Sequence, residues 1–521
     1  MTLTREPVSH RILRNTAVAS GARVWLLACN LALAPLVLSY LGQDRFGVWA
    51  LFWSLLHYVL LLDLGVGTAL VKHFAEHHAR GEVDELGALL RVVLAVYAGL
   101  SAAVLAVLWP VVGWLPSVLA IPDTLVPEAV VVFRGGLVVL ALVNLVTVLD
   151  ALLKALGRLD LANVALIVVS VPNVAGSVLA LRAGWGLPGL VAVVAGVYVL
   201  QLGVLAILAR RVLPALRLGR GAPRWDRLAA LGRYGAPLQV ARLADLLNYQ
   251  VDKVVLGVLT PIRYVAFYEL GAKVALLTHE VSGMLVAAVF PAASELHGGG
   301  DRARLWRLYE RGTKYLWLLT VPTLAGTWLT AHLVLRAWLG HVSADVHVAV
   351  LTLAGAYWAV ASLSMVTSIG AGIGWTRPMM RASLVRGALG LGLSIALGLA
   401  WGYRGVLVGT ALALLAGSLV MLVAFCRAFD RSLRDHAALL GRVVAVNAPA
   451  VAAGLAYVVW TAPVAAEAGR LEAVQLLLGA VAIYVVTYAA SVRVSGIVDG
   501  EDCALLGDVL PVVRWLARPA A

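Results

Sequence analysis

Residues 187–209 read LPGLVAVVAGVYVLQLGVLAILA, without one charged side chain. As a helix, an apolar run of about 20 residues is long enough to cross a hydrocarbon core about 30 Å thick. Comparable runs recur along the whole 521-residue chain, which is 62% hydrophobic and 13% charged. A soluble domain carries about twice that share of charged residues. The sequence therefore predicts an all-α polytopic membrane protein.

The apolar runs predict about 14 transmembrane helices. Their expected ranges are 14–41, 46–71, 88–112, 128–153, 160–182, 187–209, 229–258, 263–290, 314–337, 346–370, 379–401, 405–427, 440–461 and 472–493. Most of the 41 Lys and Arg residues fall in alternate connections, on the side that also holds both termini. By the positive-inside rule, that side is cytoplasmic.

An internal repeat organises these spans. Residues 184–190 and 400–406 share a Trp-Gly sequence, and residues 75–82 resemble residues 294–301 at a similar offset. Spans one to six therefore match spans seven to twelve, and an even number of helices in each unit makes the two bundles parallel repeats. The expected division is an N-terminal bundle at 1–210, a basic cytoplasmic connector at 211–228, a C-terminal bundle at 229–430, spans thirteen and fourteen at 431–493 and a cytoplasmic tail at 494–521.

Charge and motifs argue against several other classes of protein. The net charge of +13 is spread over the connections, which favours membrane topology over nucleic-acid binding. Three cysteines imply neither a disulfide framework nor a metal site. No Walker loop, HExxH motif or triad pattern is present. We therefore expect a protein that is not an enzyme and has no catalytic residues, metal or cofactor.

Ionisable residues inside spans are costly in hydrocarbon and usually face a cavity or a partner. Span seven carries the largest such set. One helical face holds Arg242, Asp245, Tyr249 and Asp252, which are spaced by three, four and three residues. The edge of this face holds Asn248 and Lys253. Two interpretations stay open for this stripe, a polar pathway and a set of internal salt bridges between helices.

Span eight adds three more ionisable residues. Glu269 and Lys273 are four residues apart and can pair within the helix, which suits either a structural or a functional role. Glu280 lacks such a partner and, if it is buried, would have a raised pKa that suits proton exchange.

The first two spans contribute further candidates. Arg23 and Asn30 lie on one face of span one. The Arg23 guanidinium suits a phosphate group, or it extends to the membrane surface. Asp63, deep in span two, is either an ion site or part of helix packing beside Gly65.

Four short segments carry a family resemblance. Residues 40–50 read YLGQDRFGVWA, residues 61–67 LLDLGVG, residues 252–257 DKVVLG and residues 267–273 FYELGAK. Together they resemble bacterial polysaccharide flippases of the multidrug/oligosaccharidyl-lipid/polysaccharide exporter superfamily. The resemblance implies two six-helix bundles in a V with two added helices, in the bacterial cytoplasmic membrane.

The resemblance also implies a substrate, an undecaprenyl-pyrophosphate-linked oligosaccharide for O-antigen-type surface polysaccharide. Such a molecule would be turned to the outer leaflet by alternating access. The candidate substrate-binding residues are Arg23, Asn30, Arg242, Asn248, Tyr249, Lys253 and Lys273. The candidate ion-coupling or charge-balancing residues are Asp63, Asp245, Asp252, Glu269 and Glu280.

The expected driving force is a proton or sodium gradient or the membrane potential. The expected partners are the lipid-linked oligosaccharide and membrane lipids, with a polysaccharide polymerase and glycosyltransferases as further candidates. A lipid II flippase and a drug/cation antiporter are the alternatives within the superfamily. An integral membrane glycosyltransferase or polymerase is the alternative from another class, and the short outer loops argue against it.

Overall fold

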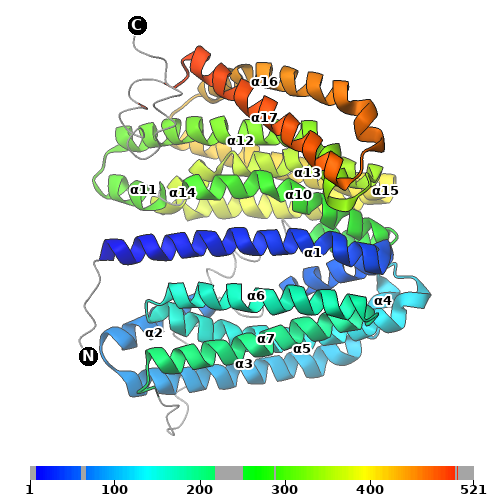
Figure 1. The fold of residues 1–521 in the computed structure, drawn as a ribbon. Coiled ribbons are helices and arrows are strands. Elements are labelled where there is room, and N and C mark those ends of the chain that lie inside the picture. Colours follow the sequence, from blue (N-terminus) through cyan, green and yellow to red (C-terminus); the bar gives the residue numbers. More distant parts are fainter. Residues whose placement is uncertain (1–7, 60–65, 217–249, 287–288, 499–501, 503–521) are drawn as a thin grey trace. The chain divides into compact units, whose positions relative to one another are not determined.

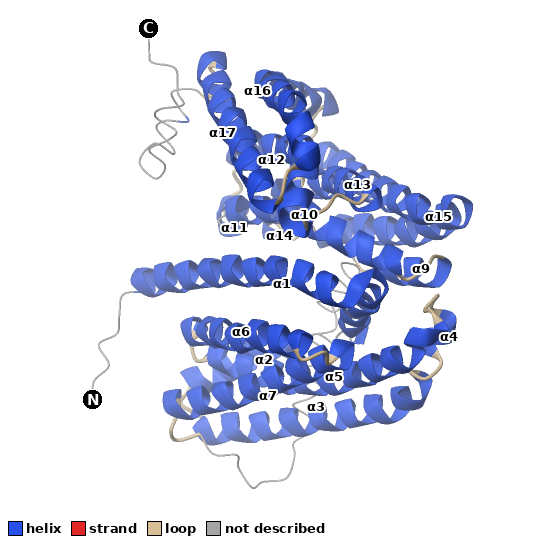
Figure 2. Cartoon of the chain, turned by 45° about the vertical axis from the view of Figure 1, so that its right-hand side comes forward, coloured by secondary structure: helices blue, strands red, loops and turns tan. Residues whose placement is uncertain are grey.

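A computed structural model describes residues 8–59, 66–216, 250–286, 289–498 and 502. All regular structure in these ranges is helical, as Figures 1 and 2 show. The chain forms two compact units, Met1–Ala266 and Phe267–Ala521, which are described one after the other. The expected all-α class is confirmed.

The first unit is a bundle in which the hydrophobic core lies between α2, α3, α5, α6 and α7. Leu86, Leu90, Leu149, Leu152 and Leu205 are among the buried residues that fill it. Helix α1 packs against α6 and α5, and α9 packs against α1. The helices are α1 (Val8–Val59), α2 (Val66–Ala79), α3 (Val83–Val111), α4 (Leu115–Val118), η2 (Asp123–Leu125), α5 (Val126–Ala155), α6 (Leu159–Arg182), α7 (Gly186–Val212) and α9 (Val251–Leu259).

The second unit is built around α12, which packs against α13, α16 and α17. Its core includes Trp306, Trp317, Leu316, Ile369 and Phe425. The boundary between the units falls within α10 (Arg263–Val286). The remaining helices are α11 (Val289–Gly298), α12 (Arg302–Leu339), α13 (Ala344–Ala361), α14 (Ser364–Gly372), α15 (Thr376–Ala428), α16 (Leu433–Glu467) and α17 (Arg470–Ser495).

Ten helices among the described residues are long and apolar enough to cross a membrane. Two of them, α1 and α15, extend over 52 and 53 residues, which is more than one crossing needs. Each is kinked at one glycine with left-handed backbone, Gly42 (φ 77°) in α1 and Gly402 (φ 58°) in α15. The sequence places span boundaries at these two points, but the number fourteen stays a prediction.

One predicted span is interrupted in the structure. Ser362 and Leu363 separate α13 from α14, within the span expected at 346–370. Hydropathy does not detect this break, because the residues on both sides of it are apolar. Of the span expected at 229–258, the structure describes residues 250–258, where Gln250 lies in a turn and α9 begins at Val251.

One type of turn between helices occurs in both halves of the sequence. The Gly81 N–H donates to the His78 carbonyl between α2 and α3, at 3.1 Å. The Gly300 N–H donates to the His297 carbonyl between α11 and α12, at 3.0 Å. Both glycines have left-handed backbone, with φ of 73° and 71°. The sequence similarity between residues 75–82 and 294–301 therefore corresponds to the same turn.

Candidate functional site

Helix α9 is held in the first unit by close backbone contacts. A Cβ atom at Gly47 would lie 2.3 Å from the Ile262 carbonyl oxygen, so only glycine permits α1 to approach this closely. At the end of α9, the Ala120 N–H donates to the Gly257 carbonyl at 2.6 Å. The Leu51 side chain of α1 lies beside Gly257. These contacts fix where the first turn of α9 places its polar side chains.

Five residues at this point form what we call the α9 cluster: Ser54, Tyr58, Gln250, Asp252 and Lys253. The Ser54 hydroxyl donates to the Gln250 backbone carbonyl at 3.1 Å, which ties α1 to the start of α9. The Lys253 ammonium donates to Gln250 Oε1 at 3.0 Å. Asp252 is 1% exposed and Lys253 is 7% exposed. Two ionisable side chains are thus buried together within one unit.

Asp252 lies in the first turn of α9. The partial positive charge at a helix N-terminus stabilises a carboxylate there. Asp252 is also close enough to the Tyr58 hydroxyl for its charge to act on that group. The Tyr58 oxygen is buried and has no hydrogen-bond partner among the residues that the structure describes.

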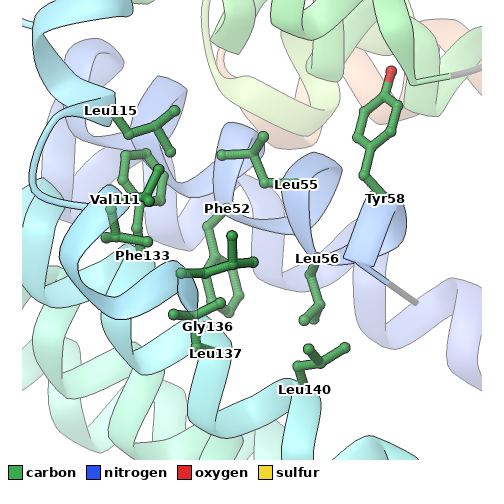
Figure 3. A pocket seen from close by; sticks show the side chains of 12 residues that line it. Phe52, Leu55, Leu56, Tyr58, Val111, Leu115, Phe133, Gly136, Leu137 and Leu140 are labelled. Atoms are coloured by element: carbon green, nitrogen blue, oxygen red, sulfur yellow. The ribbon is translucent and has the colours of Figure 1, made fainter. Parts of the chain in front are cut away.

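An apolar pocket adjoins the α9 cluster at Tyr58. Its volume is about 190 Å³, and α1, α3 and α5 supply nearly all of its lining. Figure 3 shows Phe52, Leu56, Phe133 and Leu140 around it, with the Tyr58 hydroxyl directed away from these side chains. The first unit therefore combines an apolar pocket and buried charges, an arrangement suited to an amphiphilic molecule.

Helix α10 carries a second pair of charges, in the second unit. Lys273 Nζ lies 3.1 Å from Glu269 Oε1, and the side chains are 24% and 17% exposed. Gly271 lies between them in sequence, and a Cβ there would be 2.4 Å from the Ala349 side chain of α13. The pair is therefore satisfied within one helix, beside a tight helix contact.

The other described candidates do not join either group. Arg23 is exposed, and so is Asn30, whose amide donates to the Leu26 carbonyl of its own helix at 3.0 Å. Glu280 is exposed as well, so the burial that would suit it to proton exchange is not found. Five candidates lie outside the described residues: Asp63, Arg242, Asp245, Asn248 and Tyr249.

From the predicted set, the structure brings together Asp252 and Lys253. Ser54, Tyr58 and Gln250 are members of the α9 cluster that sequence reasoning missed. Ser54 and Tyr58 are four residues apart in an apolar run, a spacing that places two polar groups on one helical face. That spacing is the signal that could have found them. No group of three or more His, Cys, Asp or Glu residues in the described ranges could hold a metal ion.

A match to a known family model shows the family of this chain. Residues 38–346, more than half of the chain and including the whole α9 cluster, match the model of a family described as polysaccharide biosynthesis protein. The chain belongs to this family. Comparison of the sequence with curated proteins finds no match.

Solved structures share the fold of this polysaccharide biosynthesis protein. The lipid II flippase MurJ in an inward closed conformation has a TM-score of 0.69 at 13% identity, covering 92% of this chain and 98% of MurJ. An inward-facing multidrug resistance MATE transporter of the MOP superfamily has a TM-score of 0.67 at 15% identity, covering 78% and 94%. A MOP superfamily transporter from Pyrococcus furiosus has a TM-score of 0.57 at 16% identity, covering 81% and 95%.

These likenesses show that the chain shares the fold of MurJ and of transporters of the MOP superfamily. The family and the apolar helices together make the chain a multi-pass membrane protein. The solved structures that share this fold include a flippase and a transporter, which agrees with the prediction that the protein is not an enzyme.

Proposed function

We propose that this protein translocates an undecaprenyl-pyrophosphate-linked oligosaccharide across the bacterial cytoplasmic membrane for O-antigen-type surface polysaccharide. The observation that carries the proposal is the α9 cluster, in which two charges are buried and Tyr58 also lines an apolar pocket. The substrate combines an anionic pyrophosphate with an apolar tail, so its two chemistries match these two surfaces. Membership of the polysaccharide biosynthesis family supports this substrate class.

Lys253 is the group that we assign to the pyrophosphate. Its ammonium already donates to a neutral amide oxygen, that of Gln250. A phosphate oxygen is a stronger acceptor, because it carries negative charge and adds an ion pair to a hydrogen bond that the ammonium already makes charge-assisted. Asp252 then balances the buried charge or takes up a coupling proton or sodium ion. Buried ionisable residues in membrane spans commonly have such roles.

The remaining candidates complete the proposal. Arg23, Arg242 and Lys273 are further cations for the pyrophosphate or for acidic sugars, and polar contacts to the sugar come from Asn30, Asn248 and Tyr249. The further ion-coupling or charge-balancing carboxylates are Asp63, Asp245, Glu269 and Glu280.

We propose alternating access between an N-terminal bundle at 1–210 and a C-terminal bundle at 229–430, with both termini in the cytoplasm. A proton or sodium gradient, or the membrane potential, drives the cycle. One elementary charge that crosses 100 mV gains about 2.3 kcal/mol. A polysaccharide polymerase or glycosyltransferases are the partners that would use or supply the substrate.

Proteoliposomes that contain labelled lipid-linked oligosaccharide test the site. We expect Lys253→Ala to lower the initial translocation rate about tenfold, the effect of losing one charge-assisted hydrogen bond. Lys253→Arg should retain part of the rate. The matched control is Lys72→Ala, because Lys72 is an exposed lysine of α2 in the same unit, 3.8 Å from Glu76. Equal rates for wild type and Lys253→Ala would overturn the assignment.

A lipid II flippase is the second candidate. The structural similarity to MurJ over 92% of this chain favours it, and the similarity to MATE transporters makes a drug/cation antiporter the next. The same proteoliposome assay distinguishes the three candidate functions when the vesicles contain, in turn, lipid-linked oligosaccharide, lipid II or a fluorescent organic cation.

A further inference from the structure

A second cavity lies in the second unit. It has a volume of about 310 Å³ and is lined by the first turns of α12, the end of α15 and the first turns of α16. Its cationic lining residues are Arg311, Lys314 and Arg442, and its carboxylates are Glu310 and Asp435. Positive groups from two helices therefore face one cavity, although sequence analysis assigned it no role.

A buried hydrogen-bond donor in this lining lacks an acceptor. Trp306 is 8% exposed, and its indole N–H has no partner among the residues that the structure describes. An indole nitrogen can only donate, and buried donors in native structures almost always have acceptors. The Arg431 guanidinium lies 5.0 Å from the Trp306 ring centroid and adds positive charge at this edge. Trp306 lines the cavity, so a ligand bound there would lie beside this ring.

The chain itself brings one anionic group to the edge of the cavity. Asp502 is 1% exposed and lies 2.6 Å from the Lys314 ammonium. Its carboxylate also accepts a hydrogen bond from the Tyr315 hydroxyl. Lys314 lines the cavity and is at the same time bound by a carboxylate that follows α17 in the chain. Any anion that enters the cavity therefore shares Lys314 with Asp502.

We propose that this cavity binds a phosphate group and that Asp502 competes with it for Lys314. A phosphate presents several strong acceptor oxygens, which match the guanidinium groups of Arg311 and Arg442 and the Lys314 ammonium. The group belongs either to the headgroup of an acidic phospholipid or to free phosphate, and both present the same oxygens. The site is independent of the proposed translocation site, which lies in the first unit.

Binding to the purified full-length protein in detergent tests the proposal. The probes are short-chain phosphatidylglycerol, phosphatidylcholine of the same chain length and inorganic phosphate, read out by native mass spectrometry and by the shift in melting temperature. We expect phosphatidylglycerol to bind about tenfold more tightly than phosphatidylcholine if a lipid headgroup is the ligand. Binding of inorganic phosphate at comparable affinity would identify a free anion instead. No preference for either anionic probe over phosphatidylcholine would overturn the site.

Variants separate this cavity from general attraction to anions. Arg442→Ala removes a cation from an exposed side chain, so the fold is retained, and we expect about tenfold weaker binding. Arg304→Ala is the matched control, because Arg304 lies on α12 outside the cavity lining and pairs with Asp301. Asp502→Asn should strengthen binding several-fold by releasing Lys314. Equal affinities for Arg442→Ala and Arg304→Ala would exclude the cavity, and an unchanged affinity for Asp502→Asn would exclude the competition.

Discussion

The charged residues of α9 and those of α10 are of the same types, yet their surroundings differ. On α10, Glu269 and Lys273 are four residues apart and pair with each other at 3.1 Å. On α9, Asp252 and Lys253 are adjacent in sequence and project in different directions, so neighbouring groups are needed to hold them. The amide of Gln250 is one of these groups. The comparison teaches that the charges of α10 can pair within their own helix, whereas the start of α9 that holds Lys253 is tied to α1 by the Ser54 hydrogen bond.

The difference has an energetic consequence. A half-buried pair within one helix contributes a fraction of a kcal/mol, about 0.3–0.5. Buried charges lose their hydration and become strongly destabilising when one compensating group is removed. Substitutions should therefore have unequal effects at the two places, and the following predictions run from the largest effect to the smallest.

The largest loss of stability is expected from a substitution that displaces α9. Gly47→Ala places a Cβ 2.3 Å from the Ile262 carbonyl oxygen, which cannot yield without moving backbone. We expect a loss of about 3 kcal/mol in the free energy of unfolding, or no folded protein. Gly99→Ala is the control, because nothing lies within 4 Å of a Cβ on this helical glycine. It should leave stability unchanged or raise it by up to about 1 kcal/mol. Thermal unfolding in detergent measures both, and similar melting temperatures would contradict the close contact.

The comparison itself is tested by Lys253→Met against Lys273→Met. Methionine keeps an unbranched side chain and removes the charge in both variants. We expect Lys253→Met to cost about 2 kcal/mol, because it removes the hydrogen bond from a buried ammonium to Gln250 Oε1. Lys273→Met should cost less than about 1 kcal/mol, because the Glu269 side chain is partly exposed. Denaturation curves of the two variants decide the matter, and the reverse order would show that burial is not the deciding factor.

The smallest predicted effect concerns the link between α1 and α9. Ser54→Ala removes the hydrogen bond to the Gln250 carbonyl, and we expect it to cost about 1 kcal/mol in stability. Tyr58→Phe, one turn along the same helix, removes a hydroxyl that has no partner in the described part of the chain. It should therefore leave stability unchanged. The same unfolding assay compares the two variants, and equal losses would mean that the Ser54 hydrogen bond contributes nothing specific.

Much of the fold could be predicted because its signals are local. The kink of α15 at Gly402 and the turns at Gly81 and Gly300 coincide with glycines that the sequence comparison had already aligned. Hydropathy locates the apolar helices for the same reason, because the free energy of transferring a segment into the membrane depends on the residues of that segment. The break at Ser362 was missed, because hydropathy follows composition and the residues on both sides of the break are apolar.

The candidate site could be predicted only in part. Asp252 and Lys253 stand out as charges in an apolar run, whereas Ser54 is an ordinary residue until it is seen to bond Gln250, 196 positions away. Glu280 illustrates a second limit of local sequence. It is the same type of residue as Glu269 and lacks a partner four residues away, but its sequence does not say whether it is buried, and the structure leaves it exposed.

By itself, the sequence determined that the chain crosses a membrane repeatedly as helices, where its glycine turns lie and that Glu269 can pair with Lys273. These properties depend on neighbours within a few residues. Only the tertiary structure decided that Asp252 and Lys253 are buried beside Tyr58 and an apolar pocket, and that α12, α15 and α16 enclose a cationic cavity. The physical reason is that burial of a charge depends on which distant helix packs over it.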